Sequence, residues 1–232
     1  MKSSKSDSTS DSKSDSTSAA KPAVKPAAKP AASAPRDRYH HGDLRQSLID
    51  AAIALIQDGD LSQVSLREVS RRVGVSHNAP YRHFQDKEAL LNAVAAQGFQ
   101  GLKRVTEAAI AVTPGDAAEQ LQAIGKAYIQ FAVQNPVYYR VMFSLSDAQQ
   151  DAALKEAMAQ SWGVLFQVIL AGQASSVFRA EDPRQMAQVA WAMVHGIALL
   201  AIEGQLRVQS GEDFDAFLEF STRMLSQGLQ QQ

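Results

Sequence analysis

Side chains that can hydrogen-bond with the edges of nucleic-acid bases lie four residues apart near the end of the first third of the chain. Asn78 and Arg82 have this spacing, and on a helix they would share one face. Pro80 and Phe84, also four apart, would share the opposite side. A short helix with a polar outer face fits the major groove of DNA, which is wide enough to admit it. The spacing therefore predicts a DNA contact, while a small structural pair of helices would show the same periodicity.

A second group of side chains has the composition of a small-molecule site. Residues 116–230 are rich in aromatic side chains and Met, which together can line an apolar pocket that carries a few polar groups. For any one of them core packing is the commoner role, and His195, which titrates near neutrality, has the alternative of a hydrogen-bonded core or interface histidine. The pocket predicted from this group contains Tyr128, Phe131, Tyr139, Met142, Phe143, Phe166, Met193 and His195.

The residue patterns of common enzymatic mechanisms are missing from the sequence. It contains no Cys, no G-x-S-x-G elbow, no H-E-x-x-H pair and no glycine loop of the phosphate-binding type. His40 and His41 are adjacent, so they point apart on any regular element and make a poor metal pair. We therefore expect no enzymatic activity, no catalytic residue, no metal site and no cofactor.

Helices explain the apolar spacing from Arg36 onward, and no run alternates long enough to predict a strand. The first helix is expected to end at Gly59, and Ser65 with Glu68 forms a capping box for the second. A turn at 73–76 leads to a third helix, which is expected to run from Ser76 to about Phe84. The sequence thus predicts an all-α protein of about nine helices, with an N-terminal three-helix domain that contains a helix-turn-helix.

The remaining helices have start signals of the same kind. Asp86 is expected to cap a fourth helix whose apolar face contains Leu91, Val94, Leu102 and Val105. Later starts are predicted at Asp116, Asn135-Pro136 and Asp182-Pro183. The segment from Val189 to Ile202 is apolar nearly all round, so its helix should be covered on more than one side.

Composition divides the 232 residues into three parts. Residues 1–35 are a low-complexity tail rich in Ser, Lys, Pro and Ala, with six Lys against three Asp, and are expected to be disordered. Residues 36–90 form the helix-turn-helix domain, and residues 91–232 form the larger ligand-binding and dimerisation domain. Absence of Cys, of an apolar leader and of a bilayer-length apolar run predicts a cytoplasmic protein without a membrane partner. The tail is either a solubilising leader or a basic arm that scans phosphates.

Residues 65–91, SLREVSRRVGVSHNAPYRHFQDKEALL, resemble the helix-turn-helix of the tetracycline-repressor-like (TetR) family of transcriptional regulators. The lead-in from Arg38 to Arg45 is typical of one branch, and Trp191 with residues 194–198 resembles the branch with a Trp-His-Gly regulatory domain. Position 80 departs from the family pattern, because Pro replaces the Leu of many relatives. Since Pro lacks an amide proton and restricts the residue before it, we expect the recognition helix to begin irregularly.

The resemblance implies roles for individual residues. His77, Asn78 and Ala79 would approach base edges, Arg67 would reach a guanine, and Tyr81, His83, Lys87 and the helix start at Ser76 would contact phosphates. The predicted DNA-binding set is completed by Arg38 of the lead-in. Two long helices, near 183–205 and 212–229, would pair with their copies in a second subunit. The interface residues predicted there are Trp191, Leu199, Phe217 and Met224.

The function that this resemblance implies is that of a homodimeric repressor, released from a palindromic double-stranded operator by a small, largely apolar effector. Effector binding would tilt the fourth helix and spread the two recognition helices. An alternative is an architectural, nucleoid-type binder driven by the basic tail, without a small-molecule ligand. A third reading is a ligand-sequestering or interaction protein with a vestigial helix-turn-helix, which would not bind DNA.

Overall fold

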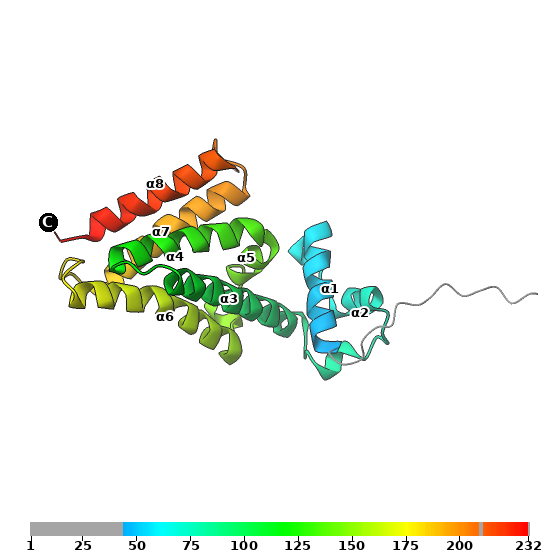
Figure 1. The fold of residues 1–232 in the computed structure, drawn as a ribbon. Coiled ribbons are helices and arrows are strands. Elements are labelled where there is room, and N and C mark those ends of the chain that lie inside the picture. The colour runs from blue at the N-terminus through cyan, green and yellow to red at the C-terminus, as the bar shows by residue number, and fades with distance from the viewer. Residues whose placement is uncertain (1–43, 209–210, 232) are drawn as a thin grey trace, which may run out of the picture. The chain divides into compact units, whose positions relative to one another are not determined.

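The computed structural model describes residues 44–208 and 211–231, and within these ranges it contains helices and no strand. The all-α prediction is therefore confirmed, with eight α-helices in the described residues where about nine helices were expected. Three short 3₁₀ helices add single turns: η1 (Leu61–Gln63), η2 (Pro80–Arg82) and η3 (Asp147–Gln149). The α-helices, labelled in Figure 1, are α1 (Leu44–Asp58), α2 (Leu66–Val73), α3 (Lys87–Ala111), α4 (Ala117–Gln134), α5 (Pro136–Met142), α6 (Ala152–Ala174), α7 (Pro183–Ile202) and α8 (Glu212–Leu229).

Aspartate caps begin three of the long helices where the sequence predicts them. The carboxylate of Asp86 accepts a hydrogen bond from the amide of Ala89 at 2.8 Å and starts α3. Asp116 and Asp182 cap α4 and α7 in the same way. A carboxylate at this position satisfies amides that lack a partner inside the helix, so these starts are fixed by local chemistry.

The predicted third helix, Ser76 to Phe84, is wrong. Pro80 has no amide hydrogen to donate to Ser76, and the segment closes instead with short-range bonds from Ala79 N to Ser76 O and from His83 N to Pro80 O, at 3.0 and 2.9 Å. Only Pro80–Arg82 is helical, as the single 3₁₀ turn η2. We call residues 76–84 the recognition segment. The irregular start expected from Pro80 extends through the whole of this segment, because the hydrogen bond that Pro80 cannot donate falls near its centre.

Helix α3 joins the helix-turn-helix to the rest of the fold. It has 25 residues, begins beside α1 and runs between α4 and α6 (Figure 1). Leu91, Val94 and Leu102 are buried along it as predicted, whereas Val105 is exposed. Four residues before α3 are buried in the same core cluster as Leu91 and Leu102: Leu48 and Ile49 of α1, Val69 of α2 and Phe84. One continuous core therefore connects both functional regions.

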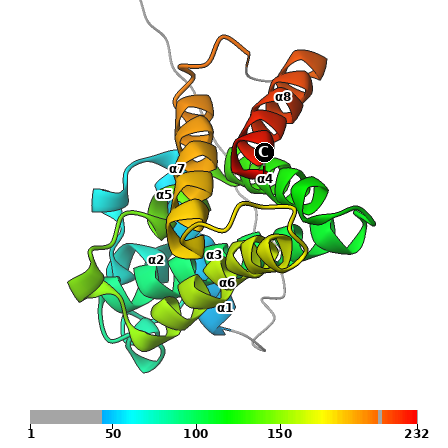
Figure 2. The same ribbon diagram turned by 90° about the vertical axis from the view of Figure 1, so that its left-hand side faces the viewer.

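Helices α7 and α8 both pack against α4, which Figures 1 and 2 show from two sides. Within the described residues α7 is the one helix whose length and apolar content would allow it to span a membrane. It packs against α4 and α6, with Met186, Ala190 and Val194 among its buried residues, and much of its remaining surface is exposed in the described part of the chain. Val189, 60% exposed, lies on that surface, so residues 44–208 and 211–231 do not supply the cover that the sequence predicts on more than one side.

A glycine allows the C-terminal end of α6 to approach the next segment closely. A Cβ atom at Gly172 would overlap the ring of Phe178, which is itself fully buried. Phe178 also forms an isolated backbone bridge with Gln230, after the end of α8. This contact links the ends of α6 and α8.

Candidate DNA-binding surface and ligand cavity

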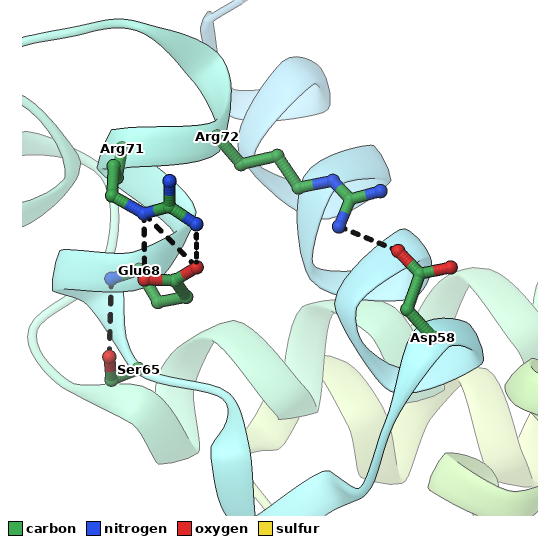
Figure 3. A network of polar contacts seen from close by, with 5 residues as sticks. All are labelled: Asp58, Ser65, Glu68, Arg71 and Arg72. Atoms are coloured by element: carbon green, nitrogen blue, oxygen red, sulfur yellow. Dashed lines mark hydrogen bonds and ion pairs between the residues drawn. The ribbon is translucent and has the colours of Figure 1, made fainter. Parts of the chain in front are cut away.

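Helix α2 is held at both ends by the residues that the sequence marks. The Ser65 hydroxyl accepts a hydrogen bond from the amide of Glu68 at 3.2 Å (Figure 3). At the other end, Gly74 terminates the helix with a left-handed φ of 77°. Only half of the predicted capping box forms, because the Glu68 carboxylate accepts hydrogen bonds from Arg71 instead of reaching back. The bonds from Arg71 lower the pKa of Glu68.

Two arginines of α2 are paired within the protein. Besides Arg71, Arg72 forms an ion pair with Asp58 at the end of α1, with a nitrogen–oxygen distance of 2.8 Å (Figure 3). The Arg45 guanidinium lies over the ring of Phe84, 5.3 Å from its centre. Arg67 is exposed at the start of α2 and is the α2 arginine for which no ion pair is present within the described part of the chain.

The recognition segment presents polar side chains despite its lack of an α-helix. Asn78 and Arg82 are exposed, while Pro80 and Phe84 are buried, so the predicted division into two sides is confirmed. The rings of His77 and Tyr81 stack with centres 6.0 Å apart and planes inclined by 17°. Ser76 and His83 are exposed and Ala79 is half-buried. Eight of the nine predicted DNA-contact residues are described, and Arg38 lies outside the described residues.

Lys87 braces the start of α3. Its ammonium donates hydrogen bonds to the carbonyls of Leu61 and Ser62 at 2.8 and 3.2 Å. Asp60 caps the same 3₁₀ turn by accepting from the amide of Ser62, a bond that lowers the pKa of its carboxyl. A DNA phosphate that contacts Lys87 would therefore have to share the ammonium group with these two carbonyls.

A cavity of about 680 Å³ lies among α3, α4, α6 and α7. Of the eight residues predicted to line a pocket, Tyr128, Phe143 and Phe166 line it. Phe131 lines a separate hollow with Tyr138 and Arg104. The other four predicted residues are off the cavity wall: Tyr139, Met142, Met193 and His195.

The composition that predicts an aromatic pocket does not say which of the aromatic side chains point inward. Tyr139 and Met142 are 1% exposed on α5 and belong to the core. The residues that the prediction missed include Phe99 and Leu102 of α3, Trp162 of α6 and Arg184 of α7. Trp191, predicted for the dimer interface, also lines the cavity. The spacing of Arg184, Gln188 and Trp191 on one helical face was the available signal.

Three side chains form a hydrogen-bonded cluster behind one wall of the cavity. The Tyr139 hydroxyl lies 2.6 Å from His195 Nδ1, and the Tyr128 hydroxyl lies 3.1 Å from both groups. Trp191 donates its indole N–H to the Tyr128 hydroxyl at 3.3 Å. Burial raises the pKa of Tyr128 to about 12 and lowers the pKa of His195, so the cluster is neutral at physiological pH.

Large apolar side chains are exposed along α7 and α8. Phe220 is 53% exposed and Met224 49% exposed on α8, and Val189, Leu199 and Leu200 are exposed on α7. Of the predicted interface residues, Leu199 and Met224 thus lie at the surface and Phe217 is half-buried. Several large exposed apolar side chains on two neighbouring helices make α7 and α8 candidates for a protein–protein contact. No group of His, Asp and Glu in the described ranges could hold a metal ion.

Two family models match the chain, one for each functional region. Residues 48–94 match the model for bacterial regulatory proteins of the tetR family, and residues 121–225 match the tetracyclin repressor-like C-terminal domain. The first match contains the recognition segment, and the second contains most of the cavity wall together with α7.

Two proteins that are similar to this chain are named as HTH-type transcriptional regulators. The HTH-type transcriptional regulator BetI of Escherichia coli is 29% identical over 164 residues, covering 68% of this chain and 81% of BetI. YobS of Bacillus subtilis, an uncharacterized HTH-type transcriptional regulator, is 22% identical over 189 residues, and the match covers 81% of this chain and 93% of YobS.

Solved structures have the same fold. A Rhodococcus sp. RHA1 protein of unknown function has a TM-score of 0.74 and 31% identity, covering 84% of this chain and 100% of its own. A TetR family transcription regulator of Marinobacter aquaeolei has a TM-score of 0.66 and 16% identity, covering 81% of this chain and 96% of its own. With both domain models matched in order, the chain is a member of the TetR family of DNA-binding transcriptional regulators.

Proposed function

We propose that this regulator is a homodimeric repressor which a small, largely apolar effector releases from a palindromic operator. The DNA-contact set is the one expected from the sequence: Arg38, Arg67, Ser76, His77, Asn78, Ala79, Tyr81, His83 and Lys87. Two observations support it. The polar side of the recognition segment is exposed, and a cavity of the size that small ligands need lies in the C-terminal half.

The observation that carries the proposal is the position of α3. This helix begins three residues after Phe84, the buried end of the recognition segment, and its middle supplies Phe99, Leu102 and Thr106 to the cavity. A ligand that fits only when α3 moves away from α6 would therefore displace the helix start beside the DNA. Because a packed helix moves as a unit, a small shift at the cavity changes the distance between two recognition segments in a dimer.

A second connection runs through α5. The Tyr138 hydroxyl donates to the Gln97 amide oxygen at 3.4 Å, and Gln97 in turn donates to the Gln46 oxygen of α1 at 2.6 Å. The neighbouring Tyr139 belongs to the cluster behind the cavity wall. One short helix thus contacts both the cavity wall and the first helix of the DNA-binding region.

The proposed domain boundaries follow the same logic. Residues 36–90 form the DNA-binding domain and residues 91–232 the effector and dimerisation domain, with a boundary that falls inside the continuous helix α3. Trp191, Leu199, Phe217 and Met224 remain the proposed interface set, of which Leu199 and Met224 have the strongest support because they are exposed. We place the protein in the cytoplasm, where its operator is.

Footprinting on the DNA that flanks the coding region tests this proposal. The full chain and a chain lacking residues 1–35 should protect the same palindrome, with half-sites about 34–36 Å apart or a multiple of that distance. His77→Ala combined with Asn78→Ala should abolish that protection at fixed salt, while Val112→Glu, an exposed residue at the end of α3, serves as the control.

The two alternatives from the sequence give different footprints. An architectural binder would cover DNA diffusely, would lose binding when salt is raised or the tail removed, and would tolerate the double substitution. A protein with a vestigial helix-turn-helix would protect nothing. Either pattern would contradict the proposed repressor.

A further inference from the structure

The cavity has one charged side chain among the described residues that line it. That side chain is Arg184, and neither Asp nor Glu contributes to the wall. Arg184 lies in the first turn of α7 and is exposed, and Gln188 lies one turn further on the same face. Trp191 follows on that face, so α7 presents a polar end and then an aromatic surface to the cavity.

The Arg184 guanidinium is available to a ligand. Asp182, two residues earlier, caps α7 by accepting a hydrogen bond from the backbone amide of Arg184 at 2.8 Å. No ion pair joins the Arg184 side chain to a carboxylate in the ranges that the structure describes. A guanidinium in this state offers five N–H donors in a fixed planar arrangement that matches a carboxylate.

The rest of the cavity favours hydrocarbon. Phe143 and Trp162 are 36% and 37% exposed there, so apolar ligand atoms would cover aromatic surface that now faces water. The Thr106 hydroxyl donates to the carbonyls of its own helix, and the Tyr128 hydroxyl is engaged by Tyr139 and Trp191. Polar groups along the length of a ligand would lose their hydrogen bonds to water and would find these two hydroxyls already engaged in other hydrogen bonds.

We propose that the effector of this regulator is an amphipathic anion: an apolar chain or ring system with one terminal carboxylate. The apolar part occupies the space between α3, α4 and α6, and the carboxylate accepts hydrogen bonds from Arg184 and Gln188 at the rim. This assignment rests on the proposed function, since it names the chemistry of the effector for the same cavity. A quaternary ammonium would also find aromatic faces there, but it would meet the positive charge of Arg184 without a carboxylate to balance it.

The two tryptophans of the chain supply the measurement. Trp162 and Trp191 both line the cavity, so the intrinsic fluorescence of the unmodified protein reports its occupancy. Decanoate, decanol and decyltrimethylammonium have equal chain lengths and differ in head-group charge. Titrated below their micelle-forming concentrations, decanoate should bind at least about tenfold tighter than the other two, as expected for a charge-assisted pair.

Substitution assigns the preference to one side chain. Arg184→Gln should bring the affinity for decanoate down to that for decanol and leave decanol binding unchanged, whereas Arg184→Lys should keep part of the preference. Arg207→Gln, an exposed position beyond the end of α7, should change neither affinity. Because Arg184 is exposed, its substitution should leave the fold intact, which circular dichroism verifies.

The outcomes separate this inference from the function on which it rests. Equal binding of all three ligands, tighter binding of the ammonium, or a decanoate preference that survives Arg184→Gln would each overturn the anion assignment. Release of the footprinted operator by decanol alone would then still support a ligand-responsive repressor. Failure of every ligand to change fluorescence or operator binding would count against both the anion assignment and the effector response.

Discussion

His195 is expected to make the stability of the folded protein depend on pH. Burial lowers its pKa below the ordinary value of 6.5, and its Nδ1 atom lies 2.6 Å from the Tyr139 hydroxyl, within hydrogen-bond distance. Below pH 6.5 His195 therefore takes up more protons in the unfolded chain than in the folded chain, so the free energy of unfolding falls as the pH falls. The contribution of the neutral His195 to stability is complete only above pH 6.5.

We expect this dependence to be absent from His195→Gln. Urea unfolding at several values between pH 5 and 8 should show the wild-type midpoint decreasing toward acid more steeply than the variant midpoint. The comparison cancels the contributions of all other ionisable groups, which both proteins share. Parallel curves would show that His195 does not carry the pH dependence.

Lys87 is the residue at which a structural and a DNA-binding role can be separated. Lys87→Met keeps the aliphatic stem but removes the donor to the Leu61 and Ser62 carbonyls, so the free energy of unfolding without DNA should fall by about 1–2 kcal/mol. If Lys87 also contacts a phosphate, the slope of log K against log salt should decrease by about 0.9. Unchanged stability would contradict the bracing role.

At the scale of elements, helix α6 contains two glycines in opposite environments. Gly172→Ala would drive a methyl group into the buried ring of Phe178, and such overpacking should destabilise the protein by about 1–3 kcal/mol. Gly163, in the same helix, has open space at its Cβ position. Gly163→Ala should therefore stabilise by about 0.5–1 kcal/mol through helix propensity alone.

Thermal or urea unfolding of both variants measures these changes side by side. The matched pair separates packing from helix propensity, because the same substitution is made twice in one helix. A stabilised Gly172→Ala protein would show that Phe178 can move aside at little cost.

Local chemistry explains which elements the sequence predicts well. Three helix starts are each determined by one carboxylate and the backbone amides next to it, at Asp86, Asp116 and Asp182. A few neighbouring residues therefore suffice to predict each start. The recognition segment is determined by an absent donor at Pro80, whose effect spreads beyond the helix start.

The cavity wall depends on information that the local sequence does not contain. Phe131 and Tyr128 are both aromatic and three residues apart on α4, yet only Tyr128 reaches the cavity. Which of two neighbouring aromatic side chains faces the hollow depends on where α3 and α6 cross α4. Those crossings are set by tertiary packing.

At the scale of the whole molecule, the exposed apolar surface of α7 and α8 predicts assembly. Phe220→Glu combined with Met224→Glu would bury unpaired charges in a two-fold interface, so sedimentation at micromolar concentration should change from dimer to monomer. Operator affinity should fall at least about a hundredfold, because each monomer reaches only one half-site.

Val112→Glu is the matched control for this experiment. Val112 is 80% exposed at the end of α3 and is on neither α7 nor α8. The same change of apolar side chain to carboxylate should leave both the dimer and operator affinity intact. A wild-type protein that sediments as a monomer would remove the basis for the palindromic operator.

If dimers form through the exposed side chains of Phe220 and Met224, gene control becomes sensitive to the amount of the protein in the cell. Where chains are scarce enough to be mostly monomeric, the number of dimers rises with the square of the number of chains, by mass action. Doubling synthesis would then raise the operator-binding species about fourfold. Two hydrophobic side chains on the last helix would thereby make the amount of operator-binding protein rise more steeply than the amount of chain synthesised, before any effector enters the cell.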